Sequence, residues 1–309
     1  MRRERRNIPI LVGAALGLAA LTPLRAQTGG SPTKAPAAPT QASVLAAASA
    51  ADWRPLDPEN TLYLELASGR VVIELAPAFA PNHAANVKAL AREGYFDGLT
   101  INRVQDNYVA QWGDANEGSG KRVIRQAKPT LPAEFDVALS PGAPFTLSPD
   151  GDLYAAEAGW SGGFPAARDP KSGRAWITHC YGTLGTARGN GADSGGGSQL
   201  FVVIGHAPRH LDRNDTALGR VVKGIELLST LPRGAGALGF YEKPEERVAI
   251  RSIRVAADVP PAERTALQVL RTDTPTFRSL IAARRTRTEE WFKYPVGRIE
   301  VCNVPIPTK

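Results

Sequence analysis

An arginine and a glutamine, Arg103 and Gln111, stand out in the stretch LTINRVQDNYVAQWGD at residues 99–114. Its apolar and polar residues alternate, which is typical of a strand with one buried face. A guanidinium donates hydrogen bonds from a planar fork, and an amide both donates and accepts them. The two side chains are therefore candidates to bind and polarise a polar group. The alternatives are an ion pair of Arg103 with Asp106 or Asp114, and a buried Gln111 amide that completes a backbone hydrogen bond.

Other kinds of catalytic site find little support in the sequence. The four histidines, His83, His179, His206 and His210, lack the spacing of metal ligands, so we expect no metal and no other cofactor. The GGGSQ motif at residues 195–199 has no nearby His and Asp in an order that suits a serine hydrolase.

The N-terminal residues are typical of a secretory signal peptide. Four arginines among the first six residues precede an apolar run at residues 8–24, and Ala26 is a small residue at which cleavage fits. The run is short of the roughly 20 residues of a membrane span and is interrupted by prolines. We predict a signal peptide at residues 1–26, exported by the general or the twin-arginine route. The mature protein is then periplasmic or secreted, with no stable membrane span.

The charge of the chain is concentrated in that segment. The formal charge is +7, and loss of the five Arg and one Glu of residues 1–26 leaves +3. A chain this close to neutrality gives no reason to expect a nucleic acid partner.

The rest of the chain divides by composition into three parts. Residues 27–52, rich in Ala, Pro and Thr, lack the apolar residues needed for order and are predicted to be a linker. Residues 53–259 contain many short alternating segments and few helical ones, which predicts one mainly β domain closed into a barrel. A Gly/Pro/Asp-rich segment at about 137–178 is an enlarged insertion in it.

Residues 260–309 are predicted to be a C-terminal extension that packs on the barrel. Thr274 and Pro275 predict the start of a basic helix that runs to about Trp291, with its arginine cluster on a solvated face. GRIEVCNV, at residues 297–304, is interpreted as a last strand.

The chain has two cysteines, Cys180 and Cys302. In an oxidising compartment they can pair and tie the extension to the main domain. The alternative is two separately buried thiols, because the sequence gives no distance between them.

Four motifs occur in the order and approximate spacing of a known family. GYFDGLTINRV, GTLGTARG, GSQLFVVIG and HLDRNDTALGRVVKG together resemble the cyclophilin-type peptidyl-prolyl isomerases, in their bacterial secreted branch. The resemblance covers roughly residues 60–256. It implies a closed antiparallel eight-stranded barrel capped by two helices. It also implies isomerisation of X-Pro bonds in exported polypeptides, which assists their folding, by an enzyme that we expect to be a monomer.

The implied chemistry needs no nucleophile, metal or general base. Rotation about the bond before proline is slow because amide resonance raises a barrier of roughly 18–20 kcal/mol. A fixed arginine can donate toward the prolyl nitrogen or steady the carbonyl side, which stabilises the twisted amide preferentially.

The resemblance implies roles for nine residues. Arg103 matches the family's catalytic arginine, and Gln111 matches the glutamine that orients the substrate backbone beside it. The predicted substrate-binding residues are Tyr108, Val109, Ala187, Phe201, His210, Leu211 and Asp215.

Several positions depart from the family pattern. Asn102 replaces a His, Trp112 replaces a glycine, His210 stands where drug-binding relatives often carry Trp, and Asp215 stands where a His or Tyr lines the pocket. A carboxylate at position 215 can pair with Arg103 or Arg213, or face solvent, and pairing with Arg103 would weaken the site. Trp112 lies either near the groove or in the core. These departures leave open an alternative function, a catalytically weak cyclophilin-like peptide-binding or chaperone module.

Overall fold

The computed structural model describes residues 38–116 and 120–309. The predicted signal peptide and residues 27–37 of the predicted linker lie outside the described residues. Within the described part of the chain, no helix combines the length and apolar character that crossing a membrane requires.

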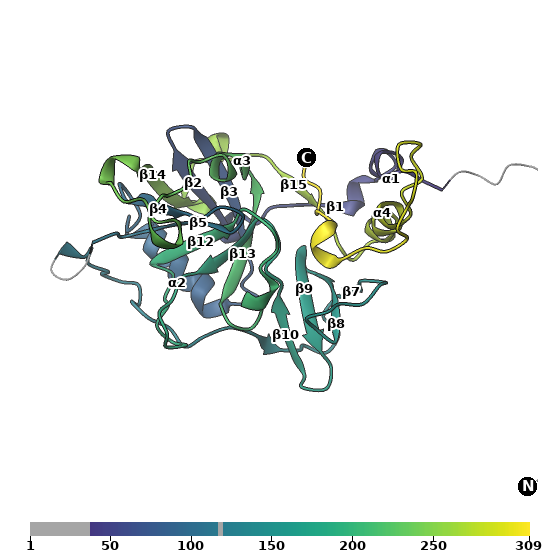
Figure 1. Ribbon diagram of the computed structural model, residues 1–309, viewed down its shortest axis with the longest axis horizontal. Coiled ribbons are helices and arrows are strands. Elements are labelled where there is room, and N and C mark those ends of the chain that lie inside the picture. The colour runs from purple at the N-terminus through teal and green to yellow at the C-terminus, as the bar shows by residue number, and fades with distance from the viewer. Residues whose placement is uncertain (1–37, 117–119) are drawn as a thin grey trace, which may run out of the picture. The chain divides into compact units, whose positions relative to one another are not determined.

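Eight antiparallel strands close into a barrel, which confirms the predicted fold class (Figure 1). Around the barrel the order is β11-β12-β5-β4-β14-β2-β3-β13, and β13 pairs with β11 to complete it. The strands are β2 (Thr61–Leu66), β3 (Gly69–Leu75), β4 (Thr100–Val104), β5 (Val109–Gly113), β11 (Thr183–Thr186), β12 (Gln199–Val203), β13 (Ala217–Lys223) and β14 (Val248–Val255). Closure leaves this sheet without an unpaired edge.

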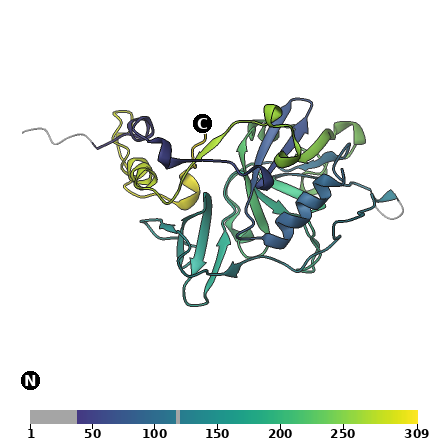
Figure 2. The same cartoon turned by 180° about the vertical axis from the view of Figure 1, so that it is seen from behind.

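Two helices pack against the barrel, as predicted. Helix α2 (Pro81–Arg92) begins at a proline and buries Ala84, Val87 and Leu90 in the same core as the inward-facing strand residues (Figure 2). The short helix α3 (Glu226–Ser229) adds Leu228 to that core.

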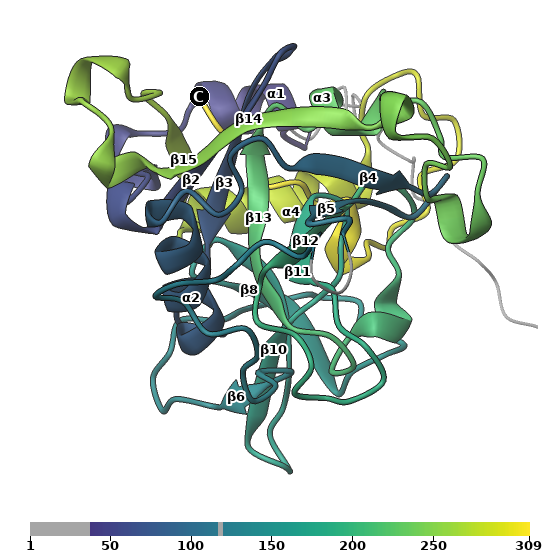
Figure 3. The same ribbon diagram turned by 90° about the vertical axis from the view of Figure 1, so that its left-hand side faces the viewer.

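The insertion forms a second sheet beside the barrel (Figure 3). Its order is β6-β10-β9-β8-β7, and its strands are β6 (Val137–Ala138), β7 (Thr146–Leu147), β8 (Glu157–Ser161), β9 (Phe164–Asp169) and β10 (Arg174–Ile177). Phe164 and Ile177 of this sheet pack with Ala76 and Ala217 of the barrel region. The sheet is therefore joined to the barrel by buried apolar contacts.

The linker prediction is wrong for the residues that the structure describes. Helix α1 (Gln41–Ala46) is capped by the Thr40 side chain, and it buries Val44 against helix α4 (Pro275–Thr286). Strand β1 (Trp53–Pro55), directly after the predicted linker, pairs with β15 (Gln268–Leu270). These residues are ordered by partners more than 200 positions away, which local composition does not reveal.

The C-terminal extension packs mainly on the inserted sheet rather than on the barrel. Phe277 of α4 meets Trp160 of β8 edge to face, with ring centroids 5.4 Å apart. Contact with the barrel is made by Leu267, which lies in a small cluster with Tyr63 and Val72, and by hydrogen bonds such as that from the Thr265 amide to the Tyr63 hydroxyl. The expectation that the extension packs on the barrel is therefore only partly met.

Within the extension, the predicted start of the helix is confirmed, because the Thr274 side chain accepts a hydrogen bond from the Phe277 amide. The helix ends at Thr286 instead of Trp291. GRIEVCNV forms the 3₁₀ turn η9 (Val301–Asn303) and not a strand. The arginine cluster is not simply solvated, since Arg285 pairs with Asp150 at 2.8 Å and Arg284 donates to the Asn303 carbonyl.

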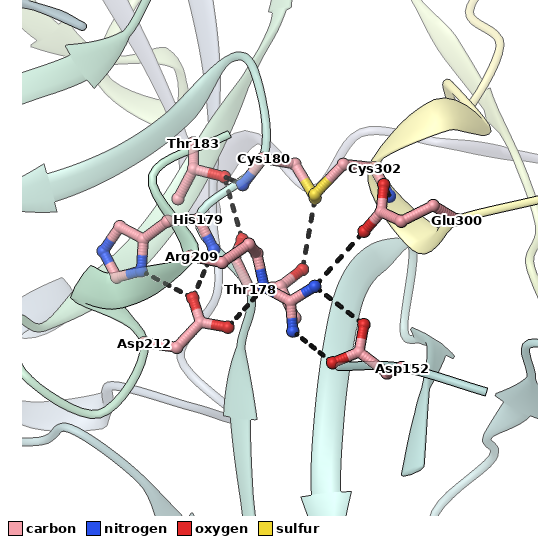
Figure 4. Close-up of a disulfide and its surroundings, with 9 residues drawn as sticks. All are labelled: Asp152, Thr178, His179, Cys180, Thr183, Arg209, Asp212, Glu300 and Cys302. Carbon is pink, nitrogen blue, oxygen red and sulfur yellow. Dashed lines mark hydrogen bonds and ion pairs between the residues drawn. A yellow bond between two sulfur atoms is a disulfide. The ribbon is translucent and has the colours of Figure 1, made fainter. Parts of the chain in front are cut away.

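Cys180 and Cys302 form a disulfide, so the alternative of two separate thiols is wrong. Beside it lies the buried guanidinium of Arg209, which pairs with Asp152 at 2.9 Å and with Asp212 at 2.6 Å (Figure 4). Arg209 also contacts Glu300, next to η9. Covalent and ionic links therefore join the barrel loops, the insertion and the extension at one point.

Candidate active site

A β-bulge places Arg103 opposite Gln111. Ile101 pairs with Trp112, but the next paired residue on β4 is Arg103, so that Asn102 is the extra residue. In a regular strand Arg103 would share the inward face of Ile101, because alternate residues lie on the same side. The bulge turns the arginine to the outer face of the barrel. Gln111 is on the same face, because its sequence neighbours Ala110 and Trp112 both face the core.

The guanidinium of Arg103 is held by three acceptors. Nε donates to the Leu238 carbonyl at 2.7 Å, Nη1 donates to Oε1 of Gln111 at 2.9 Å, and Nη2 donates to Oε1 of Gln105. Its carbon lies 5.7 Å from the centre of the Tyr108 ring and 5.5 Å from that of Phe240. An arginine has five N–H groups, so two remain without a partner among the described residues. Burial lowers the pKa of Arg103, which nevertheless stays charged at any ordinary pH.

Arg103 lies at a cavity of about 270 Å³ on the outside of the barrel. Eight of the nine predicted site residues line it: Arg103, Tyr108, Val109, Gln111, Ala187, Phe201, Leu211 and Asp215. Arg188, Leu238 and Phe240 complete the lining. The ninth, His210, is adjacent to the cavity: its ring is stacked on that of Tyr108, with the ring centroids 6.2 Å apart. The structure thus brings the predicted residues together, while their individual roles stay predictions.

The floor of the cavity is apolar and separate from the barrel interior. Val109, Phe201 and Val203 are buried together on the outer face of β5 and β12, with Leu211 packed against them. Gly185 lies opposite Phe201 on β11, and a Cβ at Gly185 would lie 2.4 Å from the tip of the Phe201 ring. A glycine is therefore required here to seat the ring.

The structure resolves the positions that depart from the family pattern. Trp112 is fully buried in the barrel core and does not enter the cavity. Asp215 pairs with neither Arg103 nor Arg213; its carboxylate accepts a hydrogen bond from the Thr216 amide at 2.8 Å. Arg213 pairs instead with Asp136 at 2.7 Å. Asp215 therefore leaves the guanidinium of Arg103 in place.

Asp215 is nevertheless an unusual group for an apolar pocket. Burial raises the pKa of its carboxyl group to about 6, against the smaller opposing effect of nearby His179. Arg188 also lines the cavity, but its guanidinium donates to the Asn214 carbonyl and forms no ion pair with Asp215. The pocket thus contains a carboxyl group that changes charge near neutral pH.

Four residues of the site were not predicted from the sequence. Gln105 lies two positions after Arg103, just past the end of β4, and its polar character at an alternating position was an available signal. Arg188 directly follows the predicted Ala187. Leu238 and Phe240 come from a loop more than 130 residues away, and nothing in the local sequence indicates that they reach Arg103.

Comparison with known protein families shows to which family the chain belongs. The family model described as cyclophilin type peptidyl-prolyl cis-trans isomerase/CLD matches residues 61–255, which is more than half of the chain and contains every residue of the cavity. The chain belongs to this cyclophilin family.

Curated relatives carry the same activity in their names. A probable peptidyl-prolyl cis-trans isomerase of Brucella suis is 29% identical over 199 residues, which cover 62% of this chain and 81% of that protein. Peptidyl-prolyl cis-trans isomerase B of Bacillus subtilis is 29% identical over 177 residues, covering 57% of this chain and 92% of that protein. The chain is accordingly a cyclophilin-type peptidyl-prolyl cis-trans isomerase.

A solved structure extends the likeness beyond the family domain. The cyclophilin AquaCyp293 from Hirschia baltica superposes with a TM-score of 0.68 and 28% identity, over 87% of this chain and 97% of its own. That share exceeds the region matched by the family model, so part of the chain outside residues 61–255 has a counterpart in this cyclophilin.

Proposed function

We propose that the cavity at Arg103 binds X-Pro segments of exported polypeptides and catalyses rotation about the prolyl bond, which assists their folding. The observation that carries this proposal is the state of Arg103. Three hydrogen bonds hold its guanidinium at the rim of an apolar cavity, and two of its N–H groups have no partner in the described part of the chain.

The residues of the cavity suit both binding of the proline ring and polarisation of its amide. Phe201, Val109 and Leu211 form an apolar seat for a pyrrolidine ring. A donor from Arg103 toward the prolyl nitrogen competes with amide resonance, which lowers the barrier without any covalent step. Gln111, held through its Oε1 by Arg103, keeps its NH₂ group for the carbonyl of a bound peptide backbone.

The proposal of an exported protein, of the bacterial secreted branch, has two supports. The first is the signal-like character of residues 1–26. The second is the Cys180–Cys302 disulfide, because such bonds persist in oxidising compartments and are rare in the cytosol.

The test is a cis/trans assay on short Xaa-Pro peptides with the wild-type chain, Arg103→Ala and Arg103→Lys. We expect measurable catalysis by the wild type and a loss of about 100-fold in kcat/KM for Arg103→Ala, since a preorganised donor contributes on this scale. Arg103→Lys keeps the charge but not the planar fork, and we expect it to recover little. Catalysis that is absent in the wild type, with peptide binding retained, would favour the alternative of a peptide-binding or chaperone module.

A further inference from the structure

The segment between α4 and η9, residues 287–300, exposes three large apolar or aromatic side chains within six consecutive residues. Trp291 is 81% exposed, Tyr294 94% and Val296 82%. Single exposed apolar side chains are ordinary, but a group of them in one short segment marks an interaction site. This segment lies outside the catalytic cavity and has no part in the proposed reaction.

The same segment is strongly basic. Between residues 284 and 298 the chain has five basic and two acidic side chains. Four of the basic ones, Arg284, Arg285, Arg287 and Arg298, line a cavity of about 240 Å³ together with Phe292 and Tyr294.

Two of these guanidiniums are available to a ligand. Arg285 is paired with Asp150, and Arg284 donates to Gln41 and Asn303. The guanidiniums of Arg287 and Arg298 have no hydrogen-bonded or ionic partner among residues 38–116 and 120–309, although the Arg287 guanidinium carbon lies 4.9 Å from the centre of the Phe292 ring. The exposed apolar side chains are thus accompanied by cationic groups with unused donors.

The segment is closed at its base by one carboxylate. Asp150 accepts from Arg285, just before the segment, and from the Ile299 amide at 2.8 Å, near its end. The disulfide at Cys302 follows directly. A loop that is tied at both ends loses less conformational freedom when it binds, so its exposed side chains are presented ready for a partner.

We propose that residues 287–300 bind the surface of an anionic lipid bilayer. Trp and Tyr side chains favour the interface between lipid and water, where the ring is buried and its polar atom stays wet. Arg287 and Arg298 then meet the lipid phosphates, and each basic residue near an anionic surface adds to the attraction. Trp291, Tyr294 and Val296 enter the interface, and the barrel with its cavity stays in water.

Trp291 itself reports on this contact. Trp112, Trp160 and Trp176 are buried in the protein, so Trp291 is the most exposed of the chain's five tryptophans. We would mix the full chain with vesicles of phosphatidylglycerol and phosphatidylcholine whose acyl chains are brominated, which quenches tryptophans that enter the bilayer. The expected result is quenching that is absent in Trp291→Phe. This readout is independent of any binding by the apolar N-terminal run.

Charge substitutions complete the test. Arg287→Gln/Arg298→Gln should weaken quenching on anionic vesicles by about 10-fold or more in apparent affinity. Arg251→Gln/Arg254→Gln removes the same charge from exposed positions of β14 and should have little effect. The proposal is overturned if Trp291 is not quenched on anionic vesicles, if pure phosphatidylcholine vesicles quench it equally, or if both double variants behave alike. Vesicle binding without Trp291 quenching would mean that another part of the chain contacts the lipid. The exposed segment would then be a candidate surface for a protein partner, which also contradicts the proposal.

Discussion

Nη1 of Arg103 donates a 2.9 Å hydrogen bond to Oε1 of Gln111, its direct partner across β4 and β5. The contact exists because Asn102 forms a bulge. Without that extra residue the guanidinium would face the barrel core, where an unpaired charge is very costly. The position of the arginine thus depends on one irregularity in strand pairing, and the following predictions concern the groups that hold it and its cavity.

Gln105 is predicted to be a positioning residue for Arg103. Gln105→Leu removes one of the three acceptors of the guanidinium, and the loss of a hydrogen bond to a charged group corresponds to about 1.5 kcal/mol or more. We expect kcat/KM to fall roughly 10-fold, with most of the loss in kcat, because the peptide seat is intact. Gln105→Glu keeps the acceptor and should recover the rate. Equal activity of Gln105→Leu and wild type would contradict this role.

Gly185→Ala is predicted to impair peptide binding. The new methyl group collides with the Phe201 ring and pushes it into the cavity, so KM should rise several-fold in the peptide assay. Gly159→Ala is a matched control in the inserted sheet, where a Cβ would lie 2.1 Å from the Thr146 carbonyl oxygen. We expect it to lower the unfolding temperature and to leave KM unchanged. A rise in KM for both variants would mean that the effect is not local.

Asp215→Asn is predicted to stabilise the protein in a pH-dependent way. The folded-state pKa of about 6 lies above the ordinary value of 3.8, so the folded protein binds the proton more tightly than the unfolded chain. The resulting stability is present below about pH 4 and is lost as the pH rises through 6. The neutral amide avoids that loss, by up to about 3 kcal/mol at pH 8. Urea unfolding of wild type and Asp215→Asn at pH 4 and pH 8 measures this difference in stability. The same difference between the two proteins at both pH values would disprove the prediction.

Arg209 is predicted to be important for stability and not for catalysis. Arg209→Met leaves Asp152 and Asp212 buried without their cation, and breaking a buried pair on one side costs about 3–5 kcal/mol. Arg233→Met is the control, since its pair with Asp106 is exposed and should contribute less than about 1 kcal/mol. Urea unfolding measures the free energy of unfolding that each variant loses relative to the wild type. Similar losses for both variants would argue against a special role of the buried network.

Much of the barrel was predictable because its residues follow local rules. Alternation in β2 and β3 around Gly69, the helical spacing of Val87 and Leu90, and the turn glycines are all visible in a short window. The site residues were found through family motifs, and Arg103 and Gln111 also through their unexpected polarity. The bulge at Asn102 has no such signal, because it is defined only by how two strands pair.

The remaining errors concern contacts between distant parts of the chain. Val44 of α1 and Phe277 of α4 are buried in one cluster, so each helix depends on the other for its order. The composition of either segment alone does not reveal the partner that buries it. The acceptor carbonyl of Leu238 is a backbone atom that any residue supplies, which leaves no trace in the residue type. The fate of the two cysteines depended on a distance that only the folded chain provides.

The pairing of β1 with β15, and of α1 with α4, has a consequence for the order in which the molecule is completed. A chain that leaves a ribosome or an export channel emerges from its N-terminus. The barrel strands β2 to β14 can pair as soon as residue 255 is out. Residues 41–55 must wait for residues 268–286, although they emerge before the barrel strands. These early residues are therefore among the last to become ordered, and they stay accessible to chaperones and proteases until then.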